Sequence, residues 1–388
     1  MKQGAETERR TSTPAGAAAE IERTAERLRK ELAAALEDAG DLPDPAWRAA
    51  FRAVPRHLFV PYYYDPSGLK ISREQRPGLW LRGVHSDNAL VTRRFGGEPT
   101  SSSSQPSLMA EMLHQLETAD GQRVLEIGTG TGYNAALLAH RLGDTNVTSI
   151  DITPELTAAA RAHLAEAGYH PTVITGDGAL GWPEKAPYHR IIATCRVDTV
   201  PLPWLRQLTR DGLMVAPLGN AVARLRRTGA DEAEGRFLAG AWFMPLRATA
   251  SATAVGRPPV TAPPAEPGPA DARRTALGAA AVDDDDFRFL LSLVEPDLDW
   301  RRDPDPEGDS PTLVCLRAAD GSIARLHRAG RVEEAGPRRL WARLEELHDV
   351  WTAAGRPGPR RFGITVDGPY QTLWTDSPDG PSWLLPHR

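Results

Sequence analysis

The chain has 388 residues, and its 46 lysines and arginines against 51 aspartates and glutamates give a net charge of −5. This length is enough for two domains with a sizeable core. The small negative charge offers nothing general for binding nucleic acid or an anionic membrane surface. The two cysteines, Cys195 and Cys315, lie far apart and provide neither zinc-ligand spacing nor a disulfide framework, so we expect no metal.

The N-terminus is polar, so no signal peptide is expected. No apolar run approaches the ~18 residues that a membrane span requires. These features predict a soluble, cytoplasmic protein.

The first elements are predicted to be helical. Apolar residues recur at helical spacing between residues 17 and 39, and this helix should end near Gly40. A second, short helix is expected over residues 44–54. The string Val-Pro-Arg-His-Leu-Phe-Val-Pro at residues 54–61 then predicts a turn followed by a short apolar strand, and a further helix is expected over residues 107–116.

The most informative stretch covers residues 123–134 and reads RVLEIGTGTGYN. Its apolar start predicts a buried strand, its glycines alternate with other residues, and a helical pattern follows. Strand, glycine-rich turn and helix together are typical of a nucleotide-binding corner, because glycine lets the backbone approach a ligand closely.

The spacing of the glycines narrows the choice of ligand. The dinucleotide pattern G-x-G-x-x-G fails because Tyr133 stands at its last position, and no Gly-Lys-Ser/Thr follows for a phosphate-binding loop. The pattern that remains, E-x-G-x-G-x-G, resembles the first motif of S-adenosylmethionine-dependent methyltransferases. A second acid should end the next strand and hold the ribose hydroxyls. Asp151 stands there, and Asp177 with Gly178 fits the loop that brackets the adenine. An ordinary strand–turn–helix without a ligand is the alternative.

The resemblance implies S-adenosyl-L-methionine as cofactor and S-adenosyl-L-homocysteine as product. The residues that it assigns to the cofactor are Glu126, Gly128, Thr129, Gly130, Gly132, Asn134, Asp151, Ile152, Asp177 and Gly178.

Composition divides the chain into four parts. A tail and helix over residues 1–43 precede a methyltransferase domain over 44–248, a Pro/Ala-rich linker over 249–285 and an accessory domain with its own core over 286–388. In the last part we expect strands at 312–316, 323–327, 362–366 and 371–374, and an amphipathic helix over 337–353 with Trp341 and Trp351 in the core. The acidic run 283–286 is interpreted as helix N-terminal charge.

Residues 54–61 also closely resemble the opening signature of the protein-L-isoaspartate (D-aspartate) O-methyltransferases. The family's aromatic-x-Asp element corresponds to His85-Ser-Asp87, and its Gln-Thr-Ile-Ser followed by x-Pro corresponds to Ser101–Ser104 followed by Gln105-Pro106. The resemblance covers residues 44–246. It implies an α/β, class I methyltransferase fold that is Rossmann-like with a mostly parallel sheet, with N-terminal helices and a smaller α+β C-terminal domain.

The implied reaction is methyl transfer to a peptide carboxylate. A carboxylate is ionised at neutral pH, so the nucleophile needs no general base. The protein has to align the reacting atoms and exclude water. The resemblance assigns the catalytic role to Ser104, whose hydroxyl can donate to one carboxylate oxygen. It places Ser101, Ser102, Ser103, His85 and Asp87 at the peptide substrate.

Three features depart from the repair enzymes of this family. Four serines replace Gln-Thr-Ile-Ser, Asn134 stands where glutamine is frequent, and a second domain is added. These features resemble actinobacterial relatives that methylate one Asp of a lanthipeptide, lasso peptide or graspetide and thereby install aspartimide or isoAsp. We therefore expect a modified precursor peptide as partner. General isoaspartyl repair is the alternative, and a regulatory protein without turnover and a nicotinamide oxidoreductase are more distant ones.

Overall fold

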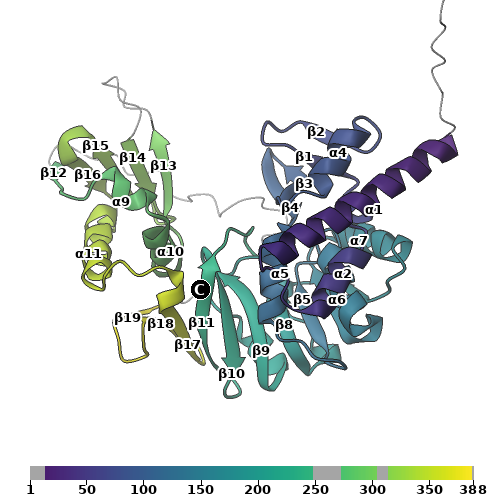
Figure 1. The fold of residues 1–388 in the computed structure, drawn as a ribbon. Helices are drawn as coiled ribbons and strands as arrows, with labels where there is room; N and C mark the ends of the chain where they lie inside the picture. The colour runs from purple at the N-terminus through teal and green to yellow at the C-terminus, as the bar shows by residue number, and fades with distance from the viewer. Residues whose placement is uncertain (1–13, 248–271, 304–312, 387–388) are drawn as a thin grey trace, which may run out of the picture.

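The computed structural model describes residues 14–247, 272–303 and 313–386. Within these ranges the strands form a ten-stranded sheet, a four-stranded sheet and a five-stranded sheet. Figure 1 shows the ten-stranded sheet along the bottom of the molecule, with the four-stranded sheet at one end and the five-stranded sheet at the other.

The N-terminal helices are α1 (Pro14–Asp38), α2 (Pro45–Ala53) and α3 (Arg56–Phe59). The first two confirm the prediction, and the Asp44 side chain caps α2 by accepting from the Ala46 amide at 2.8 Å. The strand expected within residues 54–61 is wrong, because α3 occupies that place and the first strand begins only at Tyr62. The side chains of Arg56 and His57 are buried in α3, so tertiary contacts override the apolar pattern.

A small antiparallel sheet follows that the sequence does not predict. Its strands, in the order β2-β1-β3-β4, are β1 (Tyr62–Tyr64), β2 (Lys70–Ser72), β3 (Leu90–Phe95) and β4 (Glu98–Ser103), with α4 (Pro77–Val84) between β2 and β3. Gly96 and Gly97 join β3 to β4 with φ of 58° and 88°, the left-handed conformations of a tight hairpin turn. Helix α5 (Pro106–Gln115) comes next, as predicted.

The parallel half of the ten-stranded sheet confirms the expected α/β arrangement. Its elements are β5 (Val124–Ile127), α6 (Tyr133–Leu142), β6 (Val147–Asp151), α7 (Pro154–Glu166), β7 (Thr172–Thr175), β8 (Tyr188–Ala193), α8 (Leu202–Gln207) and β9 (Leu208–Leu218). These strands pair in parallel in the order β7-β6-β5-β8-β9. The chain runs from β5 outward through β6 and β7 and returns as β8 on the other side of β5. This switch point between β5 and β8 is where open α/β sheets bind ligands.

The rest of the sheet is antiparallel, so the sheet as a whole is mixed. Its strands are β10 (Ala221–Arg227), β11 (Glu232–Gly240), β17 (Phe362–Asp367), β18 (Tyr370–Thr375) and β19 (Ser382–Leu384). Because β17 pairs with β11, the prediction of a separate domain over 286–388 is wrong for these strands. The pairing satisfies backbone groups that β11 would otherwise expose as an edge strand. The cores also merge, since the rings of Phe237 and Phe289 lie 4.8 Å apart.

The five-stranded sheet and its helices complete the C-terminal region. They are β12 (Ala272–Arg274), α9 (Ala279–Asp283), α10 (Asp285–Val294), β13 (Asp299–Asp303), β14 (Leu313–Arg317), β15 (Ile323–His327), β16 (Arg331–Ala335) and α11 (Leu340–Ala353). The predicted linker is therefore wrong for residues 272–285, and its residues 249–271 lie outside the described ranges. Trp341 and Trp351 are core residues, as predicted. Asp284 caps α10 by accepting from two backbone amides.

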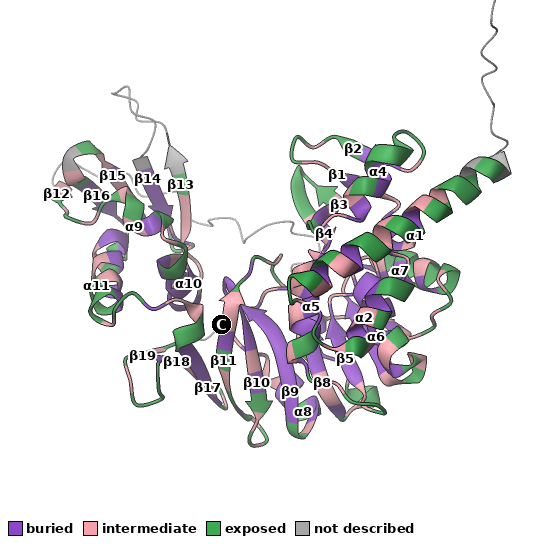
Figure 2. Ribbon diagram, viewed as in Figure 1, coloured by how far each residue is buried: buried purple, intermediate pink, exposed green. Residues whose placement is uncertain are grey.

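Figure 2 shows that buried residues follow the strands of the ten-stranded sheet, whereas α1 exposes much of its surface. In the described parts of the chain, no helix combines the length and the apolar character needed to cross a membrane.

Candidate functional site

The glycine turn after β5 has a backbone that other residues would strain. Gly128, Gly130 and Gly132 have φ of 95°, 52° and 89°. A Cβ added at Gly128 would lie 2.7 Å from Oγ1 of Thr194, and the same hydroxyl donates to the Gly128 carbonyl at 2.7 Å. The turn is therefore fitted closely against the loop that follows β8.

Glu126 supports this turn from below. Its carboxylate is 0% exposed and accepts from Asn134 Nδ2 at 2.7 Å and from Ser149 Oγ at 2.5 Å. Ser149 Oγ also lies 2.6 Å from Thr129 Oγ1. Burial raises the pKa of Glu126 to about 7, against the opposing effect of the two donated hydrogen bonds. Glu126, on β5, is thus hydrogen-bonded to both β6 and α6 next to the turn.

The two predicted acids lie at the ends of neighbouring parallel strands. Asp151, at the end of β6, accepts from the Gly130 and Thr153 amides at 3.0 Å each. Asp177 follows β7 and accepts from the Ala179 amide at 2.9 Å. Asp177 also borders a cavity of about 620 Å³ whose lining includes Ile150, Leu180 and Trp182. The carboxyl ends of β6 and β7 thus each carry a carboxylate, and an apolar cavity lies beside them.

These residues fit a cofactor that carries an ammonium group and ribose hydroxyls. The left-handed glycines leave the turn without side chains at Gly128, Gly130 and Gly132. Asn134 Oδ1 is buried and has no hydrogen-bond partner among the described residues, so a hydrogen-bond acceptor remains at the turn. Ile152, predicted beside the cofactor, directly follows Asp151 and is half-buried.

Strand β4 brings the predicted acceptor serines to the same turn. A Cβ added at Gly130 would lie 3.5 Å from the Ser102 carbonyl oxygen and 3.8 Å from Ser101 Oγ. Ser104 follows directly and is half-buried, and its hydroxyl has no partner among the residues that the structure describes. The structure therefore places the serine segment against the glycine turn, although the two are separated in sequence.

Arg56 holds this segment in place. Its guanidinium is 0% exposed and donates to five oxygens, which are Val84 O, Ser86 O, Asn88 O, Ser104 O and Ser103 Oγ, at 2.9 to 3.4 Å. It also lies over the Tyr133 ring, 5.7 Å from its centroid. Burial lowers the pKa of Arg56 to about 10. Arg56 was not predicted as a functional residue, although a charged residue inside an apolar string was a usable signal.

His85 and Asp87 were predicted at the substrate, and their contacts are with other elements. His85 is 7% exposed and its ring lies 5.9 Å from that of His57. Burial lowers the pKa of His85 to about 3, so this ring is neutral near pH 7. Asp87 accepts from the Ser107 amide at 2.8 Å and from Gln105 Nε2 at 3.1 Å, so it caps the N-terminus of α5.

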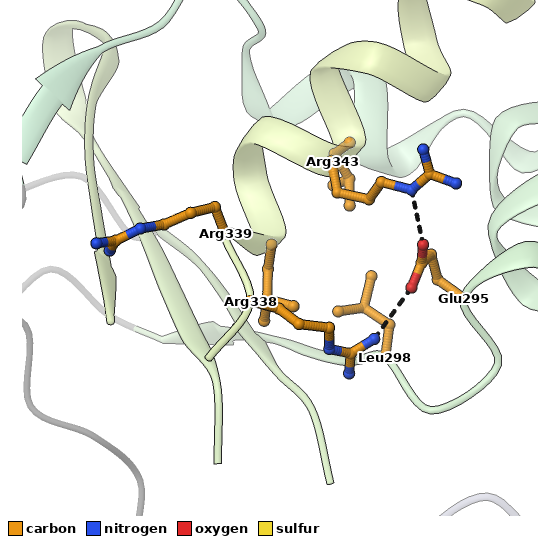
Figure 3. A pocket seen from close by; sticks show the side chains of 7 residues that line it. Glu295, Leu298, Arg338, Arg339 and Arg343 are labelled. Atoms are coloured by element: carbon orange, nitrogen blue, oxygen red, sulfur yellow. Dashed lines mark hydrogen bonds and ion pairs between the residues drawn. The ribbon is translucent and has the colours of Figure 1, made fainter. Parts of the chain in front are cut away.

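A second cavity, of about 290 Å³, lies in the C-terminal region (Figure 3). Glu295 pairs there with Arg338 at 3.2 Å and with Arg343 at 2.9 Å. The lining holds three arginines and one glutamate, and Arg338 also pairs with Asp320 at 2.9 Å, outside the lining. Among the described residues there is no cluster of three or more His, Cys, Asp or Glu side chains that could hold a metal ion.

Comparison with known proteins identifies the family. The model of the "Protein-L-isoaspartate(D-aspartate) O-methyltransferase (PCMT)" family matches residues 26–251. The chain belongs to this family. It is 40% identical over 209 residues to "Protein-L-isoaspartate O-methyltransferase 2" of Pelobacter propionicus, covering 52% of this chain and 83% of that protein. A protein of the same name from Archaeoglobus fulgidus is 36% identical over 232 residues, covering 58% of this chain and 92% of that protein.

A solved "protein-L-isoaspartate O-methyltransferase" shares the fold, with a TM-score of 0.52 at 22% identity, covering 87% of this chain and 96% of that chain. The likeness to this solved structure covers more of the chain than the family model does and so includes part of the C-terminal region. A C-terminal region of this fold is therefore not by itself a departure from proteins of that name.

Family membership confirms several expectations. The chain is an S-adenosylmethionine-dependent carboxyl O-methyltransferase of the class I fold. This excludes the nicotinamide oxidoreductase and the protein without turnover as leading interpretations. The individual site residues and the identity of the peptide stay predictions.

Proposed function

We propose that this chain esterifies an Asp side chain held in a ring of a ribosomally made peptide. The observation that carries the proposal is the position of the serine segment. It lies against the glycine turn, and its last member, Ser104, offers a half-buried hydroxyl without a partner among the described residues. A hydroxyl beside the cofactor turn is suited to hold one oxygen of a carboxylate.

Bound S-adenosylmethionine supplies the methyl group. Ser104 donates to one carboxylate oxygen and leaves the other free to face the cofactor, while Arg56 fixes the Ser104 backbone through its carbonyl at 3.0 Å. The acceptor carboxylate is already ionised, so no base is required. His85 fits this scheme, because its lowered pKa of about 3 keeps the ring neutral at neutral pH, so it does not act as a general acid.

The small side chains of the segment favour a bulky, constrained acceptor. Ser101 stands where the family pattern has Gln, and its shorter side chain leaves more room beside Gly130. Ser103 stands where the pattern has Ile, and its hydroxyl accepts from Arg56. In the methyl ester, the next backbone nitrogen can attack the side-chain carbonyl. That step forms the C–N bond of an aspartimide and releases methanol, and hydrolysis of the aspartimide gives Asp or isoAsp.

Repair of isoaspartyl residues in proteins is the second candidate. It is favoured by the curated relatives, which carry the name protein-L-isoaspartate O-methyltransferase at 36% to 40% identity over most of their length. In that case the acceptor would be the free α-carboxylate of an isoAsp residue in a flexible chain.

One experiment separates the two candidates. The full chain is incubated with methyl-labelled S-adenosylmethionine and three peptides of matched sequence: a macrocycle containing Asp, its linear form and a linear isoAsp hexapeptide. We expect a labelled methyl ester of the macrocycle, followed by release of labelled methanol and a net loss of one water from the peptide, with a kcat/KM at least ~10-fold above that of the isoAsp peptide. A preference for the isoAsp peptide establishes repair instead. Ser104→Ala serves as the matched variant and should retain affinity for S-adenosylhomocysteine.

A further inference from the structure

The loop between β8 and α8, residues 194–201, follows β8 at the switch point of the sheet, where β8 lies beside β5. It begins at Thr194, whose hydroxyl donates to the Gly128 carbonyl at 2.7 Å. Further along, Val197 bridges to Leu218 at the end of β9. Any displacement of this loop would therefore act on the glycine turn and on the space beside it.

A residue from the C-terminal region holds the far end of this loop. Gln371, on β18, accepts from the Val200 amide at 2.8 Å and donates to the Val200 carbonyl at 2.8 Å. The partners are 171 residues apart in sequence, and they are 5% and 2% exposed. One side-chain amide thus satisfies both backbone groups of one buried residue, and without it both would lack a partner.

A second contact from the C-terminal region reaches the neighbouring turn. Ser292, on α10, accepts from the Asn220 amide at 2.9 Å, and its hydroxyl would lie 2.3 Å from a Cβ added at Gly219. The Gly219 amide in turn donates to the Val197 carbonyl at 3.0 Å. The loop after β8 is therefore held directly by Gln371 and indirectly by Ser292. In Figure 1, β17 lies beside β11 and β18 lies on the other side of β17.

We propose that Gln371 is a positioning residue for methyl transfer, and that through it the C-terminal region sets the geometry of the loop over residues 194–201. The loop borders the glycine turn through Thr194, so its position governs how acceptor and cofactor meet. This role rests on the family's reaction and not on which peptide is the acceptor.

The test compares Gln371→Leu, Gln371→Glu and the control Thr372→Val in otherwise intact chains. The leucine removes both hydrogen bonds, and the glutamate can still accept from the Val200 amide but cannot donate to its carbonyl. Thr372 is the next residue of β18, and its side chain points to the other face of the sheet. Calorimetry with S-adenosylhomocysteine counts the competent sites, and hydrogen exchange reports on the loop in the cofactor-bound protein.

We expect Gln371→Leu to speed amide exchange in residues 194–201 and to lower kcat/KM per binding site by about 10- to 100-fold, on whichever peptide the parent chain methylates. Affinity for S-adenosylhomocysteine should change by less than about threefold, and Gln371→Glu should give a smaller loss. Unchanged loop exchange, or an unchanged kcat/KM per binding site, in a folded Gln371 variant would overturn the proposal. If the leucine variant does not fold, the glutamate variant decides by the same two readouts, and neither depends on the acceptor being a macrocycle.

Discussion

Glu126→Gln should remove a specific pH dependence of stability. Burial raises the pKa of Glu126 from 4.5 to about 7, so the native state holds this proton more tightly than the unfolded chain does. The stabilisation is complete below pH 4.5 and is lost as the pH rises through about 7. At ~1.4 kcal/mol per pKa unit, the shift corresponds to about 3 kcal/mol. A glutamine keeps the shape, because its oxygen can accept from Asn134 and its amide can donate to Ser149 Oγ.

The assay is urea unfolding of both proteins without cofactor between pH 4.5 and pH 8. The difference between the two unfolding free energies cancels the groups that titrate alike in both. We expect this difference to move by about 3 kcal/mol in favour of the glutamine variant across the range, most steeply between the unfolded and the native pKa of Glu126. Parallel profiles, within about 0.5 kcal/mol, would show that the Glu126 carboxyl is not destabilised by burial, and the reasoning on its environment would be refuted.

Two further substitutions test the turn and the serine segment. Arg56→Lys offers three donors to five oxygens, so we expect a loss of about 2–4 kcal/mol in urea unfolding and a lower kcat. The control Arg52→Lys, at a surface pair with Glu37, should change stability by less than about 0.5 kcal/mol, and equal effects would contradict the role of Arg56. Gly128→Ala should weaken S-adenosylhomocysteine binding at least ~10-fold, because its φ is 95° and its Cβ would lie 2.7 Å from a hydroxyl. Gly143 has a φ of 83° and open space around an added Cβ, so calorimetry should show unchanged S-adenosylhomocysteine binding for Gly143→Ala. Equal losses of affinity in the two alanine variants would show that the close contact at Gly128 has no role in binding.

The strand, glycine turn and helix that are predicted to hold the cofactor could be recognised in the sequence because they are local. The strand at 124–127, the glycines and the helix lie next to one another in the chain, and a parallel sheet then brings Asp151 and Asp177 to one edge. The supporting contacts could not be read in the same way. Ser149 contacts Glu126 only because β6 pairs with β5, and neither strand's sequence indicates which strand it pairs with.

Burial explains the main local error. The string at residues 54–61 predicted a turn followed by a short apolar strand, whereas Arg56 and His57 lie in α3 with their side chains buried. Arg56 is accommodated by carbonyl groups from residues 84–88 and 104, and such partners are distant in sequence. Of the strands in the C-terminal region, β14, β15, β17 and β18 were predicted as elements, but nothing in their patterns says that β17 would join the larger sheet instead of the smaller one.

The serine segment, Ser101–Ser104, is where this chain differs from the family pattern. The structure shows which contacts the changed side chain at Ser103 makes. At Ser103 the family pattern has isoleucine, which could not accept a hydrogen bond. Here Ser103 Oγ accepts from Arg56 Nε at 3.4 Å and from Nη2 at 3.3 Å, so the hydroxyl satisfies donors of a buried cation. The change thus alters the width and the polarity of the segment that lies against the glycine turn, while the glycines and acids predicted at the cofactor keep the family pattern. We therefore expect the choice between a ring-held Asp and an isoAsp acceptor to depend on contacts at Ser101–Ser104, because the glycine turn is predicted to hold the cofactor in either case.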